Sequence, residues 1–72
     1  MKKINKAKIK INGKKYTINP KMTLKEVIAR FKIPLDKVAI ELNENIIDKK
    51  KLNKIKIKNA DKIEIVHFIG GG

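Results

Sequence analysis

The side chains that carry most enzymatic chemistry are scarce in this sequence. It contains no cysteine, no serine, one histidine (His67) and seven acidic residues that form no close pair. Catalytic and metal sites need several reactive groups held together, and a single imidazole without a nucleophile to activate does not meet that need. The sequence therefore predicts neither a catalytic site nor a metal site within this chain. The remaining reactive group is the terminal carboxylate, which follows Gly70, Gly71 and Gly72.

The three terminal glycines allow two interpretations. Glycine loses more conformational freedom on ordering than any other residue, so the triplet could be a frayed end without a role. Alternatively, a tail without side chains could carry the Gly72 carboxylate into a narrow site on another protein. A glycine triplet considered alone favours the first interpretation. The rest of the chain must therefore decide between them.

The chemistry open to this carboxylate depends on its activation. It is an anion at neutral pH and a poor acyl donor. Attack on the α-phosphate of ATP would form an acyl-adenylate, and a sulfur nucleophile could then displace AMP and leave a thiocarboxylate. A partner enzyme would have to supply both ATP and sulfur. This chain would contribute only a thin tail and a folded body that the partner can bind.

Seventy-two residues are enough for one small domain. We expect a single domain over 1–72, with a charged lead-in at 1–6 and a tail at 69–72. No apolar run approaches the ~20 residues of a membrane span, and no apolar segment of a secretion signal follows the basic start. We therefore expect no membrane partner and a cytoplasmic location. We also expect the chain to be a monomer when it is free.

The formal net charge is +12, from 18 lysines and one arginine against the seven acids. Such a charge suggests a nucleic-acid partner. However, lysine, isoleucine and asparagine supply 39 of the 72 residues, a bias that an AT-rich coding sequence produces. Arginine, the better reader of phosphate and guanine, is nearly absent, and aromatic residues for base stacking number three. We expect no specific nucleic-acid binding, although weak binding at low salt is typical of so basic a chain.

The first 32 residues of the sequence predict a β-hairpin followed by a helix. Apolar and polar residues alternate over 7–12 and again over 14–19, and Asn12-Gly13 between them is typical of a type I′ turn. Thr23 and Glu26 have the spacing of a capping box, which predicts a helix over 24–32. Leu24, Val27, Ile28 and Phe31 recur at the spacing of one helix face, which we expect to be buried.

The remainder predicts further strands. Alternation indicates a strand at 38–43, and a short turn leads to a brief strand at 46–47. The polar segment 48–53 is expected to be irregular and anchored by Leu52. A turn at 59–61 precedes the last strand, 62–68. This order predicts an α+β, ubiquitin-like β-grasp, in which a mixed four- to five-stranded sheet packs on one helix and the last strand lies parallel to the first.

Three segments resemble the ThiS family of sulfur carrier proteins in thiamine biosynthesis. They are Val38-Ala39-Ile40-Glu41-Leu42-Asn43, then Ile46-Ile47, and then the run from Asp61 to Gly72. The resemblance extends from Ile9 to the terminus, and the glycine ending is its most specific part. The sequence departs from the family at two turns, where Glu44 and Ala60 stand at positions that are often glycine.

The resemblance implies a carrier rather than an enzyme, with no cofactor bound by the chain itself. A ThiF-type adenylyltransferase would use ATP to adenylate the Gly72 carboxylate. A sulfur donor protein would supply sulfur for the thiocarboxylate, and the sulfur would pass to the thiazole synthase ThiG. Gly71 and Gly72 correspond to the family's diglycine, whereas Gly70 is either part of the tail or a hinge. The resemblance also implies a partner-docking surface around Phe68 and Ile69 with Ala39 and Glu41.

Related functions remain open at this stage. The chain could be another β-grasp sulfur carrier, for molybdopterin synthesis or for cysteine or tRNA thiolation. Molybdopterin carriers usually have an additional helix after the first strand, for which the Asn12-Gly13 hairpin leaves no room. A ubiquitin-like modifier joined to lysines through Gly72 would use the same activation. A basic nucleic-acid-binding module is the most distant alternative.

Overall fold

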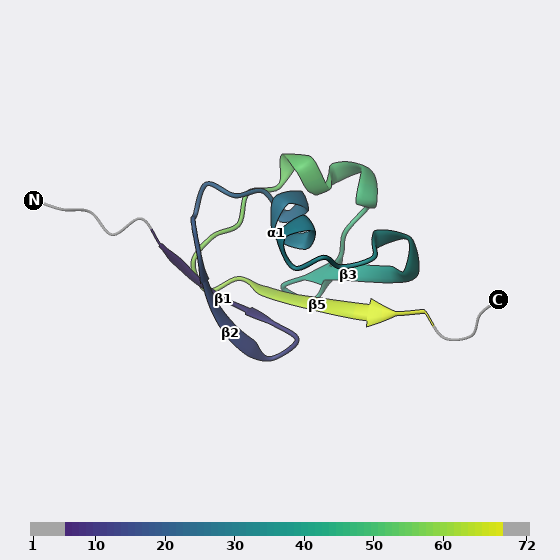
Figure 1. Ribbon diagram of the computed structural model, residues 1–72, viewed down its shortest axis with the longest axis horizontal. Coiled ribbons are helices and arrows are strands. Elements are labelled where there is room, and N and C mark those ends of the chain that lie inside the picture. The colour runs from purple at the N-terminus through teal and green to yellow at the C-terminus, as the bar shows by residue number, and fades with distance from the viewer. Residues whose placement is uncertain (1–5, 69–72) are drawn as a thin grey trace, which may run out of the picture.

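A computed structural model describes residues 6–68 as a mixed five-stranded sheet with helical segments on one side (Figure 1). The strand order is β2-β1-β5-β3-β4. In chain order, the elements are β1 (Ala7–Ile11), β2 (Lys14–Ile18), α1 (Leu24–Arg30), η1 (Leu35–Lys37), β3 (Val38–Leu42), β4 (Asn45–Ile46), η2 (Lys49–Lys54) and β5 (Lys62–His67). The predicted ubiquitin-like β-grasp is confirmed, including the parallel pairing of β5 with β1. None of the helices within residues 6–68 is long and apolar enough to cross a membrane.

The β1–β2 hairpin forms as the sequence predicts. Ala7 pairs with Ile18 at one end and Ile11 with Lys14 at the other. Asn12 and Gly13 close the turn with φ values of 50° and 84°, the left-handed conformation that these two residue types tolerate best.

Helix α1 begins at the predicted capping box. The Glu26 amide donates to Thr23 Oγ1 at 3.1 Å, and the Thr23 amide donates to Glu26 Oε1 at 2.8 Å. The helix ends at Arg30, two residues before the predicted end. Lys32 adopts a φ of 55°, and the Ile33 amide donates to the Ile28 carbonyl at 3.1 Å. This bond closes a C-terminal cap that stops the helix.

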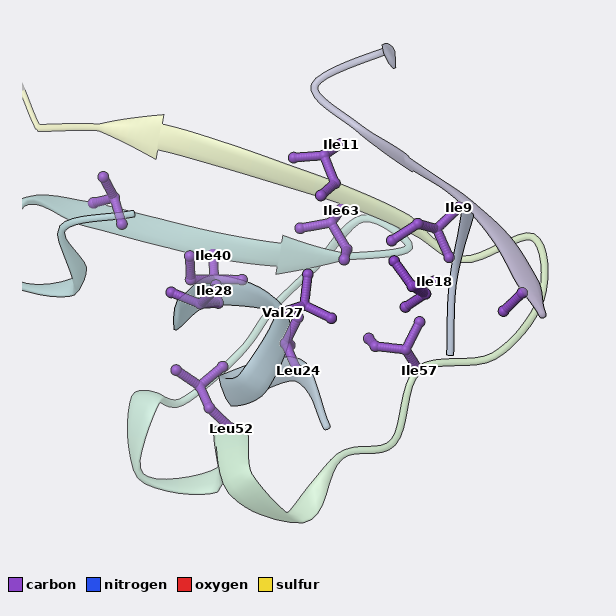
Figure 2. Packing of buried hydrophobic residues seen from close by; sticks show 12 residues of the cluster. Ile9, Ile11, Ile18, Leu24, Val27, Ile28, Ile40, Leu52, Ile57 and Ile63 are labelled. Atoms are coloured by element: carbon purple, nitrogen blue, oxygen red, sulfur yellow. The ribbon is translucent and has the colours of Figure 1, made fainter. Parts of the chain in front are cut away.

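The core lies between α1 and the sheet, and Figure 2 shows its side chains converging from both layers. Leu24, Val27 and Ile28 are buried as predicted, whereas Phe31 is half-buried at the end of the helix. Its ring lies edge-on to Tyr16, with 4.8 Å between the ring centroids. Buried side chains come from the strands, α1 and η2, and from the segment after η2: Ala7, Ile9, Ile11, Ile18, Leu24, Val27, Ile28, Val38, Ile40, Leu52, Ile57 and Ile63.

Two predictions for the second half of the chain need correction. Strand β4 is Asn45–Ile46 rather than 46–47, because Leu42 pairs with Asn45 across a two-residue turn. The segment expected to be irregular forms the 3₁₀ helix η2, which begins where the Asp48 side chain accepts a bond from the Lys50 amide at 2.9 Å. Within η2, Leu52 is fully buried, which confirms its predicted role as an anchor.

A hydrogen-bonded cluster around Asp61 holds the start of β5. Asp61 is 9% exposed. Its carboxylate accepts from the Lys58 amide at 2.7 Å and from Asn43 Nδ2 at 3.0 Å. The Asn43 side-chain oxygen accepts from the Lys62 amide at 2.9 Å, and the Lys10 amide donates to the Asp61 carbonyl at 3.0 Å. The cluster thereby joins β1, the turn after β3 and β5.

The two turns that flank this cluster use positive backbone angles without glycine. Glu44 has a φ of 73° and Ala60 a φ of 74°. A side chain in this region brings its Cβ close to the following carbonyl oxygen, at a cost of about 1–2 kcal/mol. These are the two positions at which the sequence departs from the glycines common in the ThiS family.

The Ala60 turn gives a stability prediction. We expect Ala60→Gly to raise the free energy of unfolding by about 0.5–1 kcal/mol, because relief of the left-handed backbone exceeds the added flexibility of the unfolded chain. Ala29→Gly, the same change at an exposed site in α1, should lower that free energy by about 1 kcal/mol. Chemical denaturation measures both, and a loss of stability in both variants would contradict the assigned backbone of the turn.

The Asp61 cluster gives a second stability prediction. We expect Asp61→Ala to lower the free energy of unfolding by about 2–4 kcal/mol, because it leaves the Lys58 amide and the Asn43 side chain without their acceptor. Asp36→Ala is the matched control, since Asp36 is exposed and makes no side-chain cap in η1. Its effect should stay within about 0.5 kcal/mol. Equal stability of the two variants in urea would show that the cluster does not hold β5.

Candidate functional site

Ile69, Gly70, Gly71 and Gly72, which include the predicted reactive carboxylate, lie outside the described residues. The structure instead shows how the chain leading to them is held. Strand β5 lies between β1, to which it is parallel, and β3, to which it is antiparallel. Its pairing with β3 runs from Ile63 opposite Leu42 to His67 opposite Val38. The Phe68 amide donates to the Lys37 carbonyl at 3.0 Å, so the backbone is bonded to the body as far as Phe68.

Strands β3, β4 and β5 present a second group of side chains on the sheet face away from α1, which we call the open face. Ala39 pairs with Val66, and Glu41 pairs with both Glu64 and Ile46. These five residues share one side, because paired residues in a sheet point the same way. The structure therefore places the predicted docking residues Ala39 and Glu41 together on the open face.

Phe68, the third predicted docking residue within the described range, lies one residue beyond β5. Its side chain is 61% exposed. The Lys49 ammonium group, from η2, lies 5.3 Å from the centroid of its ring. This is cation–π geometry. Phe68 thus offers an accessible aromatic ring at the point from which the tail continues.

The sequence interpretation missed two exposed apolar residues beside Ala39 and Glu41. Val66 is 47% exposed and Ile46 is 75% exposed. The alternation in β5 contained the signal for Val66, since it shares the outward positions of Lys62 and Glu64. Ile46 could be placed on the open face only from its pairing with Glu41 in the β3–β4 register, which the local sequence does not reveal.

His67 is exposed on β5 and lines a shallow hollow of about 440 Å³ together with Tyr16 and Phe31. No group of three or more histidine, cysteine, aspartate or glutamate residues within 6–68 is arranged to hold a metal ion. The candidate site therefore consists of the central strand β5, which leads toward the glycine tail, and the open face beside it.

Comparison with known proteins agrees with this architecture. The sequence pattern of the ThiS family matches residues 9–72. The sulfur carrier protein ThiS of Bacillus subtilis is 36% identical over 50 residues, which cover 69% of this chain and 76% of that protein. A crystal structure of the thiamine biosynthesis protein ThiS from Geobacter metallireducens superposes with a TM-score of 0.80 at 25% identity, covering 90% of this chain and 99% of that one.

A longer relative contains only a segment that is similar. The thiazole synthase of Paramagnetospirillum magneticum is 35% identical over 65 residues, which cover 90% of this chain. This chain spans about a fifth of that protein's length, since the match covers 20% of it. The family match covers nearly the whole sequence, and the β-grasp fold agrees with it; this chain belongs to the ThiS family.

Proposed function

We propose that this chain is a sulfur carrier for the synthesis of the thiamine thiazole ring, and that its Gly72 carboxylate carries the sulfur. The observation that carries this proposal is the extent of the family match, which includes the terminal glycines. The fold supports it, because the strand that leads to those glycines lies in the middle of the sheet. The relative in Bacillus subtilis is named a sulfur carrier protein, which agrees with this role.

The proposed reaction has two steps, both on a partner enzyme. In the first, a Gly72 carboxylate oxygen attacks the α-phosphate of ATP, pyrophosphate leaves, and an acyl-adenylate forms. In the second, a sulfur nucleophile from a donor protein attacks the acyl carbon, and AMP leaves with the attacking oxygen. The attacking atom is the outer sulfur of a cysteine persulfide on the donor, so an acyl disulfide forms within this second step. A thiol then attacks the donor's cysteine sulfur, the S–S bond breaks, and the thiocarboxylate leaves while a disulfide forms between that thiol and the donor. This chain is a co-substrate of the ThiF-type adenylyltransferase, which binds the ATP, and has no bound cofactor of its own.

The body of the protein positions the tail. The β5 pairings and the bond from the Phe68 amide to the Lys37 carbonyl fix the point from which the tail starts. Four further residues can extend at most about 14 Å, at ~3.3–3.6 Å per residue. That reach suffices to bring a carboxylate from the surface of this domain into a cleft of the partner, and glycine at 71 and 72 keeps the tail narrow.

The enzyme that receives the sulfur is, in this proposal, the thiazole synthase ThiG. The relative in Paramagnetospirillum supports this pairing. A segment similar to this chain makes up about a fifth of a protein named thiazole synthase. A carrier and a synthase that act on the same sulfur would gain from such a link, because it raises their effective concentration.

The docking surface proposed for these enzymes comprises Ala39, Glu41, Phe68 and Ile69, extended by Val66. Ala39 and Val66 pair across β3 and β5, so together they offer an apolar contact close to the tail. Apolar contact of this kind supplies affinity, while charged neighbours such as Glu41 set the orientation.

The role of the carboxylate can be tested with a single functional-group change. We expect the chain with a free C-terminus to gain the mass of one sulfur in exchange for one oxygen when incubated with the adenylyltransferase, ATP and a sulfur donor. The same chain with a C-terminal amide on Gly72 should gain nothing, because an amide cannot attack ATP as a carboxylate does. Intact-mass spectrometry measures both. Equal sulfur gain by the amidated chain would place the sulfur elsewhere and overturn the proposal.

The docking surface gives a separate prediction. We expect Val66→Glu to raise the KM of the adenylyltransferase for this chain about tenfold, with kcat unchanged, because it places an unpaired charge in the apolar contact. Val66→Ile is the matched control and should keep KM within about twofold, since the site stays apolar. Steady-state assays of pyrophosphate release measure both. The same KM for the two variants would remove Val66 from the surface.

A further inference from the structure

The end of the open face opposite to Val66 carries a row of lysines that the proposed function does not use. Lys15 of β2 pairs with Lys10 of β1, and Lys10 pairs with Lys62 of β5. The three lysines therefore lie at one level across adjacent strands, which are about 4.8 Å apart. Lys8, two residues earlier on β1, points to the same side. We call these four residues the lysine row.

The charges of the lysine row are largely uncompensated. Within residues 6–68, the ion pair present is Lys62 Nζ with Glu44 Oε2, at 3.3 Å, so Lys8, Lys10 and Lys15 have no acidic partner there within 4.0 Å. Like charges directly opposite on neighbouring strands destabilise a sheet. The row borders a shallow hollow of about 380 Å³. Asp61 lies at its edge, but that carboxylate is already bonded to Asn43 and the Lys58 amide.

The opposite end of the open face has a different character. Glu41 and Glu64 pair directly, and Ile46, Val66 and Ala39 surround them. The open face is therefore divided into an acidic and apolar region near the tail and a basic region over β1 and β2. A polarised face of this kind orients a partner, because a rotated complex would bring like charges together.

We propose that the lysine row docks against an acidic surface of the adenylyltransferase that accepts the tail. This inference rests on the proposed function. From Lys62 to His67 the strand advances about 17 Å, at ~3.3 Å per residue. An interface of about 800 Å² per partner, the usual size, is some 30 Å across. An interface of this width that begins at the tail end of the open face can therefore reach the lysine row as well.

The same observations disfavour nucleic acid as the occupant. Recognition of single strands uses aromatic rings on which bases stack. Tyr16 and Phe31 pack against each other beside the helix, and the exposed Phe68 follows the far end of β5. The row itself has no ring and no arginine. An acidic protein surface needs only charge complementarity, which the row provides.

The test compares two triple variants with the same change in net charge. The first, Lys8→Gln, Lys10→Gln and Lys15→Gln, neutralises the row and leaves the ion-paired Lys62 in place. The control, Lys50→Gln, Lys51→Gln and Lys54→Gln, neutralises exposed lysines of η2, which lies with α1 on the other side of the sheet (Figure 1). The probe is the purified adenylyltransferase with ATP, and calorimetry measures the Kd for each chain at ~50 mM and ~500 mM salt.

We expect the row variant to bind about tenfold more weakly than the unaltered chain at low salt, and the control to stay within about twofold. At high salt, the difference should shrink because the charges are screened. Both variants should remain folded by circular dichroism. For the unaltered chain, we also expect Kd to rise with salt, a measurement that needs no variant.

Several outcomes would overturn the inference. These are equal weakening by the two variants, unchanged binding by the row variant, a salt-independent Kd for the unaltered chain, or selective loss of binding to a single-stranded RNA probe with enzyme binding intact. The mass assay separates this inference from the proposed function. At saturating enzyme, the row variant should still gain sulfur, whereas failure of the unaltered chain to gain sulfur would overturn the carrier proposal itself.

Discussion

The parallel pairing of the first and last strands is the constraint on which this structure depends. Such pairing brings together residues about fifty positions apart along the chain, and it lacks the short turn that assists an antiparallel hairpin. The ladder between β1 and β5 involves few residues, with Lys10 opposite Lys62 and Ile11 opposite Ile63. The Asp61 cluster reinforces it with bonds to both sides of β5. We therefore regard Asp61 and Asn43 as the residues that hold the tail-bearing strand in the centre.

The two faces of the sheet differ in the kinds of side chain that they carry. The face toward α1 holds the buried isoleucines, leucines and valines, which stabilise the fold. The open face is free of that role, so its side chains can differ in charge without loss of the core. Within residues 6–68, every lysine is exposed except Lys62, which is half-buried, so the many positive charges do not enter the core. This separation also leaves the open face available for the docking contacts proposed above.

The turns show how the fold tolerates departures from its family. Glu44 and Ala60 adopt positive φ values where glycine would be without strain. Both turns adjoin the Asp61 cluster, and Asn43 contributes to one of them directly. The bonds of the cluster hold these turns in place despite the strain. A small domain with marginal stability can accept such positions as long as the surrounding contacts fix the backbone.

Much of this architecture could be predicted from local sequence. The Asn12-Gly13 turn, the capping box of Thr23 and Glu26, and the alternation of apolar residues depend on neighbours in the chain, and each appears as expected. The predicted ends of the helices and strands were less accurate. The cap that stops α1 at Arg30 depends on Lys32 adopting a left-handed conformation, and lysine gives little local signal for it. The 3₁₀ helix η2 is set by the burial of Leu52, which depends on residues distant in sequence.

The sequence by itself predicted the candidate reactive group, because a chain without cysteine, serine or a cluster of acids offers the Gly72 carboxylate as the remaining candidate. Only the tertiary structure decided which side chains accompany it on the open face. Val66 meets Ala39, and Lys10 lies between Lys15 and Lys62, because strands far apart in sequence pair in one register. A shift of one residue would turn each of these side chains to the other face. That register is fixed by burial of the core and by the Asp61 cluster, which are properties of the folded chain as a whole.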